Sequence, residues 1–175
     1  MSERGKRAAE MVRVHGDAVL GFCLRMLRDR TLAEDVTQQV FLEAYRDLEA
    51  LKDPAAVRSW LFGIAKNRCL DALKRVRVES NVIDNGTNAT GDVPDPGAGP
   101  LEHASDVQIT AALDNCLERL SPDVRMTVLL RFQTGATYEE LAARLGVAAD
   151  TLQVRVARAL RTLRKCLEKK GWTGE

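Results

Sequence analysis

The segment after Gly146 carries side chains whose types and spacing could bind a nucleic acid. At helical spacing one face is apolar, through Leu152, Val156, Ala159, Leu160, Leu163 and Leu167. The opposite face carries Thr151, Val154, Arg155, Arg158, Thr162 and Lys165. Cations on such a face can reach phosphates, and side chains near the start of the helix can reach base edges in a major groove. A solvated basic face is the alternative, and the short capped helix and glycine turn before this segment weigh against it.

An earlier basic segment is suited to single-stranded DNA. The apolar residues Trp60, Leu61 and Ile64 stand among cations, namely Arg58, Lys66, Arg68, Lys74, Arg75 and Arg77. Such a helix can hold the phosphates of a melted strand while a pocket holds an unpaired base, which offsets the lost stacking. We expect the Trp60 side chain to pack in the core, and its use as a platform on which a base stacks is the alternative. Two roles remain open for Asp71: a contact with DNA, or an ion pair on the helix surface.

A third segment has the pattern of a docking helix. Asp35, Gln38, Gln39 and Glu43 form a polar stripe, while Val36, Val40 and Tyr45 are expected to turn inward. An amphipathic helix can offer such a stripe to a partner's helices. An ordinary solvated helix face is the alternative.

The cysteines and histidines give no sign of a metal or catalytic centre. Cys23, Cys69, Cys116 and Cys166 lie 46, 47 and 50 residues apart, with His15 and His103 as the two histidines. This spacing does not suit zinc, and without a glycine-rich phosphate loop we expect neither an enzyme nor a cofactor. The cysteines are interpreted as buried small hydrophobic residues, with a thiol switch or mixed disulfide as the alternative.

The elements that must position these residues are expected to be helices. Ala, Leu, Glu, Lys and Arg supply almost half of the 175 residues, which is typical of helical proteins. Apolar periodicity predicts helices over about 11–27 and 32–45, with Thr31 and Glu34 as a capping box for the second. A third helix is predicted from Asp53-Pro54 to about Arg77.

The C-terminal part has the layout of a helix-turn-helix. A helix is predicted over Val107–Leu120, and Ser121-Pro122 begins another that Gly135 ends. Thr137 and Glu140 form a capping box for a short helix, and Gly146 supplies the turn into a last helix of about 20 residues.

Charge and composition divide the chain into two helical domains and a linker. The net charge is +4 over residues 1–78, −7 over 79–120 and +5 over 121–170. Residues 85–100 hold four Gly and three Pro but no Lys or Arg, which indicates a flexible linker. We therefore predict an all-α protein with domains at 1–78 and 106–175, joined by an acidic linker at 79–105. The linker is either a tether or a nucleic-acid mimic.

Four segments together resemble a known family. Residues 137–147 (TYEELAARLGV) and 151–159 (TLQVRVARA) resemble the promoter-reading C-terminal domain of the extracytoplasmic-function sigma factors, two-domain subunits that direct bacterial RNA polymerase. Residues 33–46 (AEDVTQQVFLEAYR) and 59–75 (SWLFGIAKNRCLDALKR) resemble that family's core-binding and minus-ten-reading segments, in the expected order.

The resemblance implies three sets of contact residues. The polymerase-binding set, for the coiled coil of the largest polymerase subunit, is Asp35, Gln38, Gln39, Phe41 and Glu43. The minus-ten set is Arg58, Trp60, Lys66, Asn67, Arg68, Asp71, Lys74 and Arg75, with a base pocket at about Leu48 to Val57. The minus-35 set is Tyr138, Thr151, Gln153, Val154, Arg155 and Arg158.

Some positions depart from the family pattern. Gln39 stands where Glu is frequent, which weakens one charge-assisted contact. Gln153, Val154, Ala157 and Leu160 replace residue types usual in the recognition helix. Because Gln can pair with adenine and Val can touch a thymine methyl group, we expect an altered minus-35 preference. The alternative is a weakened DNA contact.

The expected function is a sigma factor that recruits core RNA polymerase to promoters and helps to melt the minus-ten region. Its expected partners are core polymerase, duplex and melted promoter DNA, and an anti-sigma factor. No membrane-spanning run or secretory signal is apparent, so we expect a cytoplasmic protein. The alternative is a helix-turn-helix regulator that does not replace the sigma subunit, which would need a sensor domain in the N-terminal half.

Overall fold

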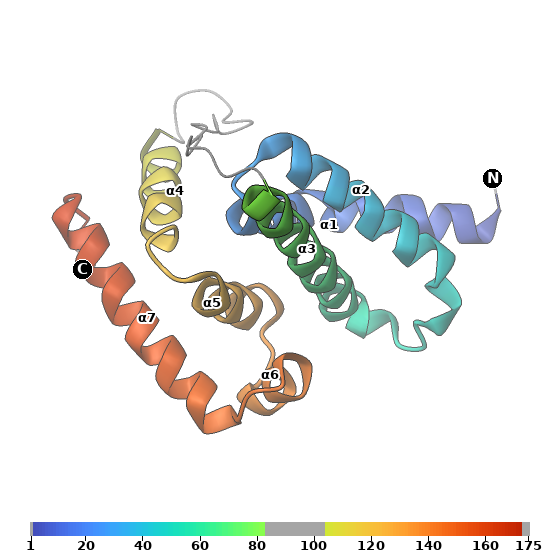
Figure 1. The fold of residues 1–175 in the computed structure, drawn as a ribbon. Helices are drawn as coiled ribbons and strands as arrows, with labels where there is room; N and C mark the ends of the chain where they lie inside the picture. The colour runs from blue at the N-terminus through green and yellow to red at the C-terminus, as the bar shows by residue number, and fades with distance from the viewer. Residues whose placement is uncertain (1, 83–103, 173–175) are drawn as a thin grey trace. The chain divides into compact units, whose positions relative to one another are not determined.

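A computed structural model describes residues 2–82 and 104–172, which are helical with short turns and contain no strand (Figure 1). The chain divides into two compact units, Met1–Val93 and Pro94–Glu175. The predicted all-α class is confirmed. Most of the predicted linker, 79–105, lies outside the described residues, as do four of the six acidic residues on which the mimic hypothesis depends, Asp84, Asp92, Asp95 and Glu102. No described helix is long and apolar enough to cross a membrane.

The first unit is a bundle of three helices that all contact one another: α1 (Glu3–Leu27), α2 (Arg30–Arg46) and α3 (Val57–Val82). Its core includes the T-shaped pair Phe22 and Phe62, whose ring centroids lie 5.4 Å apart. Two 3-10 turns, η1 (Leu48–Ala50) and η2 (Pro54–Ala56), connect α2 to α3. Residues 2–82 are therefore not the α/β sensor domain that the regulator alternative requires.

The start of α2 differs from the prediction. Asp29 is the N-cap, and its carboxylate accepts a hydrogen bond of 2.8 Å from the amide of Leu32. Thr31 therefore lies inside the helix, and Glu34 forms an ion pair of 2.9 Å with Arg30 in place of a capping box. Asp53 does cap the segment before α3 by accepting from the amide of Ala55 at 2.9 Å. However, that segment is first a 3-10 turn, and α3 runs beyond Arg77 to Val82.

The second unit contains α4 (Ala104–Leu117), α5 (Pro122–Thr134), α6 (Tyr138–Leu145) and α7 (Ala149–Lys169). Each of α4, α5 and α6 packs against α7. Its buried residues include Leu130, Leu141, Leu152 and Val156.

Local signals set the helix-turn-helix as predicted. Glu140 N–H donates to Thr137 Oγ1 at 3.2 Å, and Thr137 N–H donates to Glu140 Oε2 at 2.8 Å, which confirms the capping box. Gly135 and Gly146 end α5 and α6 at φ of 67° and 66°, a conformation that glycine adopts readily.

Two apolar residues face outward against expectation. Leu160 on α7 is 42% exposed. Cys166, six residues further along the same helix, is buried. Tyr45 on α2 is also 42% exposed, because its ring lies under the guanidinium of Arg4 at 4.8 Å and not in the core.

Candidate nucleic-acid and partner interfaces

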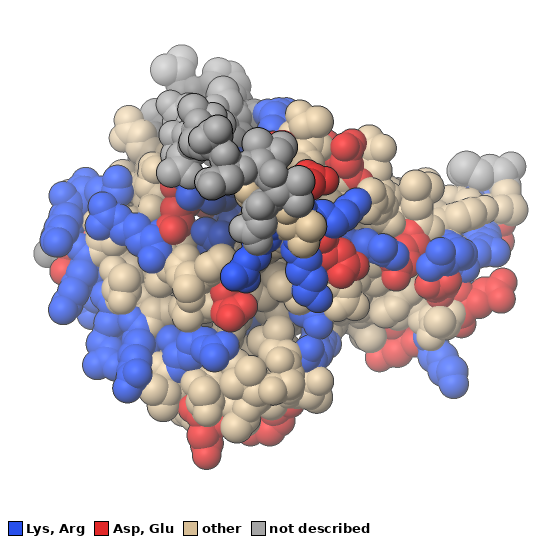
Figure 2. Space-filling view, viewed as in Figure 1, with Lys and Arg blue, Asp and Glu red and all other residues tan. Residues whose placement is uncertain are grey.

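The residues that α7 buries determine which of its side chains face outward. Leu152, Val156, Ala159 and Leu163 pack inward, which leaves Thr151, Gln153, Val154 and Arg158 exposed and Arg155 half-buried. Lys and Arg side chains follow the length of α7 (Figure 2). The sequence therefore identified the outward face of this helix correctly.

A groove of about 720 Å³ runs beside this face. Four of the six predicted minus-35 residues line it: Thr151, Val154, Arg155 and Arg158. The opposite wall consists of Arg119, Leu120 and Ser121, which lie between α4 and α5, and of Val124. Gln153 is exposed outside the groove lining. Tyr138 is half-buried on α6, with the Arg131 guanidinium 5.2 Å from its ring centroid.

The predicted minus-ten residues fall into two groups on α3. Asn67, Asp71, Lys74 and Arg75 are exposed, whereas Arg58, Trp60, Lys66 and Arg68 are half-buried. The Arg58 guanidinium lies 5.3 Å from the centroid of the Phe62 ring. The exposed cations Lys74 and Arg75 are the ones directly available to a phosphate. In the predicted pocket segment, Leu48 is buried and Lys52 to Ala55 are exposed.

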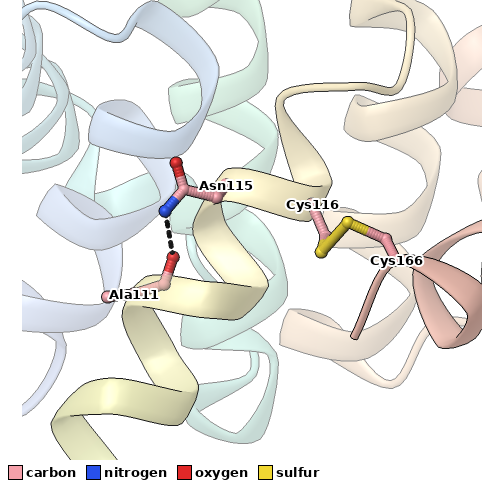
Figure 3. The surroundings of a disulfide bond; sticks show 4 residues. All are labelled: Ala111, Asn115, Cys116 and Cys166. Atoms are coloured by element: carbon pink, nitrogen blue, oxygen red, sulfur yellow. Dashed lines mark hydrogen bonds between the residues drawn. A yellow bond between two sulfur atoms is a disulfide. The ribbon is translucent and has the colours of Figure 1, made fainter. Parts of the chain in front are cut away.

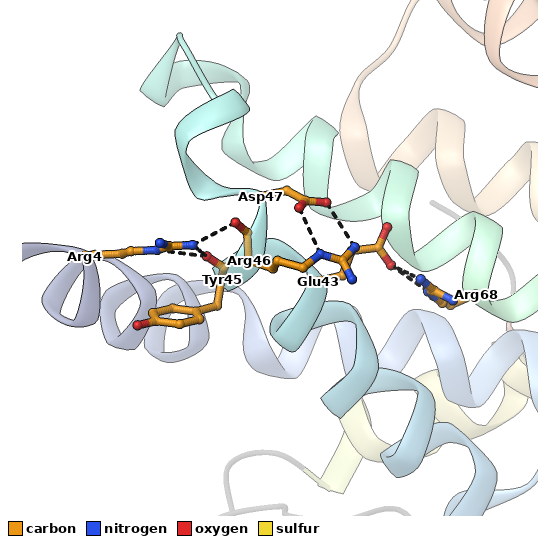
Figure 4. A network of polar contacts seen from close by, with 6 residues as sticks. All are labelled: Arg4, Glu43, Tyr45, Arg46, Asp47 and Arg68. Carbon is orange, nitrogen blue, oxygen red and sulfur yellow. Dashed lines mark hydrogen bonds and ion pairs between the residues drawn. The ribbon is translucent and has the colours of Figure 1, made fainter.

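Arg68 is held by Glu43 of α2, a contact that joins two of the predicted sets (Figure 4). Arg68 Nε donates to Glu43 Oε2 at 2.6 Å, and Nη2 also contacts that oxygen. The side chains are 37% and 24% exposed, respectively. Glu43 therefore does not belong to the exposed polar stripe, and nothing in the sequence spacing of 25 residues signals this pair.

The end of α2 is fixed by a second cluster of polar contacts (Figure 4). Arg4 donates to the backbone oxygens of Tyr45 and Arg46 at 2.8 and 2.7 Å, which satisfies carbonyls that a helix end leaves unpaired. Arg46 donates to Asp47 at 3.0 Å, and this hydrogen bond lowers the pKa of the Asp47 carboxyl group. These contacts anchor the start of α1 beside the end of α2.

Between α1 and α2 lies an apolar groove of about 590 Å³. Its lining includes Val12, Leu42 and Tyr45, which are 48%, 69% and 42% exposed, together with Gln38 and half-buried Phe41. Asp35 and Gln39 are also exposed on α2. Apolar periodicity placed Leu42 on the inward face of its helix together with Val36 and Val40, and this is wrong because Leu42 is exposed. Val12, next to buried Met11, was not predicted to line a surface.

No group of three or more His, Cys, Asp or Glu that could hold a metal occurs within residues 2–82 and 104–172. His15 is half-buried, and burial together with the charge of Arg58 lowers its pKa. His103 lies outside the described residues.

The four cysteines form two pairs. The interpretation of the cysteines as simple buried hydrophobic residues is wrong for one pair, Cys116 and Cys166. Cys116 and Cys166 are buried but joined by a disulfide, with their Cα atoms 5.8 Å apart (Figure 3). Cys23 and Cys69 are buried free thiols, as predicted. The Cys69 thiol donates to Cys23 Sγ at 3.7 Å, a hydrogen bond that lowers the pKa of Cys23 and raises that of Cys69.

Comparisons with known proteins match both units. Residues 11–78 match the family model Sigma-70 region 2, and residues 110–163 match Sigma-70, region 4. The chain is 32% identical over 163 residues to the ECF RNA polymerase sigma factor SigE of Mycolicibacterium smegmatis, across 91% of this chain but only 61% of SigE. It is 30% identical over 159 residues to the ECF RNA polymerase sigma factor SigK of Mycobacterium bovis, across 86% of this chain and 80% of SigK.

Two solved structures share the fold. The sigma factor RpoE of Bartonella quintana, in complex with the anti-sigma factor NepR, has a TM-score of 0.73 at 24% identity, over 93% of this chain and 98% of RpoE. CnrH, in complex with the cytosolic domain of CnrY, has a TM-score of 0.60 at 22% identity, over 94% of this chain and 90% of CnrH.

Proposed function

This chain belongs to the extracytoplasmic-function sigma factors of the sigma-70 family, and from that premise we propose that it gives core RNA polymerase its choice of promoter and helps to melt the minus-ten region. It does so as a non-enzymatic subunit. The observation that carries the proposal is the capped α6, the Gly146 turn and the exposed basic face of α7, in one chain with a helical unit matched to region 2. The two units supply different contacts with DNA.

In the second unit, α7 is the helix that enters the major groove. Thr151, Gln153 and Val154 stand in its first turns, where side chains reach base edges. Gln153 can make a bidentate contact with adenine, and Val154 can pack on a thymine methyl group. Arg155 and Arg158 lie further along the same face and neutralise phosphates.

In the first unit, the exposed end of α3 holds the melted strand. Lys74 and Arg75 bind its phosphates, while Asn67 and Asp71 offer polar contacts one or two turns earlier. Because Arg68 binds Glu43, we propose that it positions α3 against α2 and does not contact DNA directly.

The partner surface for core polymerase is the exposed face of α2 with the adjoining apolar groove. Asp35, Gln38 and Gln39 supply polar contacts, and Phe41 and Leu42 supply apolar ones. A helical coiled coil on the polymerase fits a groove between two helices. Since RpoE is in complex with the anti-sigma factor NepR, and CnrH with the cytosolic domain of CnrY, we also propose an anti-sigma factor for this chain and a place in the cytoplasm.

The test is transcription by purified core polymerase on a pool of random promoters, with and without this protein. We expect a shared two-part motif to be enriched among the transcribed templates only when the protein is present. Arg155→Ala with Arg158→Ala, compared with Arg164→Ala on the same helix, shows whether the recognition face of α7 is responsible. If the protein binds core polymerase poorly and start sites do not change, the proposal is wrong.

A further inference from the structure

An acidic side chain, Asp150, lines the groove that holds the minus-35 residues. It is in the first turn of α7, and it shares the groove lining with Arg119, Arg155 and Arg158. Its side chain is exposed, and no hydrogen bond or ion pair joins its carboxylate to the other described residues. The carboxylate is therefore available to a ligand that enters the groove.

The place of Asp150 on α7 is that of a side chain which reaches a base edge. Val154 and Arg158 follow it at successive intervals of four residues, so the three lie on one face of the helix. Val154 is 49% exposed on this face, and Gln153, three residues after Asp150, is also exposed. Side chains in the first turns of a recognition helix contact base edges in the major groove. A helix that brings Gln153 and Val154 to the bases brings Asp150 to them as well.

The chemistry of a carboxylate limits the bases that Asp150 can bind. An ionised carboxylate has acceptor atoms but no donor. In the major groove guanine presents the acceptors N7 and O6, and thymine presents the acceptor O4 and a methyl group. Adenine presents its N6 donor beside the N7 acceptor, whereas cytosine presents its N4 amino group as a donor alone. Cytosine is therefore the base that fits Asp150 best.

The same carboxylate disfavours DNA that lacks a cytosine at this point. Arg155 and Arg158 attract the phosphates of any sequence, which gives affinity without selection. A carboxylate that meets only base acceptors and phosphates is repelled, and binding to those sequences is weakened. Such a repulsive group raises specificity, because specificity is a difference between two affinities.

We propose that Asp150 determines specificity in the minus-35 element: its carboxylate accepts a hydrogen bond from cytosine N4 and so selects a C·G base pair beside the pairs that Gln153 and Val154 read. The proposal rests on the proposed function, in which α7 enters the major groove. The preferred element then contains a cytosine for Asp150, together with A·T pairs for Gln153 and Val154.

A carboxylate in the first turn of a helix also has a structural effect, because it interacts favourably with the positive end of the helix macrodipole. Asp123 is the matched case, since it is likewise exposed and is the second residue of α5, as Asp150 is of α7. Asp123 is not among the residues that line the groove. Asp123→Asn therefore removes the same charge from the same helical position without changing the groove lining.

The test measures equilibrium binding of polymerase holoenzyme to the promoters enriched from the random pool, with each minus-35 base pair replaced in turn by the other three. With the natural chain, we expect one position at which C·G is preferred about fivefold or more over every other pair. Asp150→Ala should reduce this preference to less than about twofold. Asp150→Asn should change it from cytosine to adenine, because an amide makes a bidentate contact with adenine N6 and N7.

The affinities of the variants supply the second readout. Both Asp150 variants should bind promoters without the cytosine more tightly than the natural chain does, because the repulsive charge is gone. Asp123→Asn should leave the base preference at every position unchanged.

Three results would overturn the role of Asp150. These are a natural chain with no position that prefers C·G, a cytosine preference that persists in both Asp150 variants, and an equal change of affinity at every position, which a purely structural or electrostatic effect predicts. Selection of A·T pairs in the same experiment would leave the proposed function intact. If no holoenzyme, natural or variant, selects a shared motif, the proposed function itself is wrong, and the role of Asp150 fails with it.

Discussion

At the scale of single residues, the contact between Glu43 and Arg68 reassigns two side chains. Both were expected to face outward, one to polymerase and one to DNA, yet they bind each other between α2 and α3. An ion pair that is partly removed from water and makes more than one hydrogen bond is stronger than an exposed pair. The pair links α2 to α3 within the first unit.

The first prediction concerns this pair. Glu43→Gln should lower the free energy of unfolding by about 1 kcal/mol, because Arg68 keeps its charge in a half-buried place without a carboxylate. The matched control is Glu10→Gln, which removes an exposed pair with Arg13 at 2.9 Å and should change stability by less than about 0.5 kcal/mol. Urea denaturation measures both. Equal effects of the two substitutions would contradict the positioning role.

A second prediction concerns the cations of α7. Arg158→Ala should weaken binding to all duplexes similarly and reduce the salt dependence by about one counterion, since a phosphate contact carries no sequence information. Gln153→Ala should instead relax the preference at one base pair by about 1–3 kcal/mol. Titration of holoenzyme with promoter variants at several salt concentrations separates the two effects. Arg164→Ala, which removes an exposed pair with Glu168, serves as the control.

At the scale of helices, capping residues decide where the helices begin. Thr137 and Thr31 show when such a start can be predicted from the sequence and when it cannot. Thr137 and Glu140 were identified correctly because the cap, the partner three residues on and the glycine turn after α6 agree. The same motif at Thr31 and Glu34 failed, because Asp29 lies two residues earlier and captures the amide of Leu32. Two candidate caps that lie two residues apart cannot be ranked from spacing alone.

The third prediction follows from this pair of threonines. Thr137→Ala should lower the free energy of unfolding of the second unit by about 1 kcal/mol, because the Glu140 amide at the start of α6 loses its partner, Thr137 Oγ1. Thr31→Ala should leave stability unchanged or slightly higher, since alanine is the better residue inside a helix. Thermal unfolding of the two variants checks this. A loss at Thr31 equal to that at Thr137 would place the start of α2 elsewhere.

At the scale of the whole molecule, the helical class, the outward face of α7 and the order of the two regions could be predicted from the sequence. The first two depend on periodicity and local signals, which lie within a few residues of each other, whereas the order of the regions follows from the resemblance of four segments to the family. The Cys116–Cys166 bond and the Glu43–Arg68 pair could not, because each joins residues that only packing brings together. The groove between α1 and α2 was missed for the same reason, since its exposed apolar residues come from two helices.

The last prediction uses the two tryptophans, one in each unit, to separate their stabilities. In Trp60→Phe the remaining reporter is Trp172, next to the end of α7, and in Trp172→Phe it is Trp60 of α3. Because the disulfide closes a loop of about 50 residues, its reduction should destabilise the second unit by up to roughly 4 kcal/mol. The first unit has no disulfide among its described residues, so its denaturation midpoint should not move. Fluorescence during urea unfolding, with and without dithiothreitol, measures both midpoints, and a parallel shift of the two would mean that the units do not unfold independently.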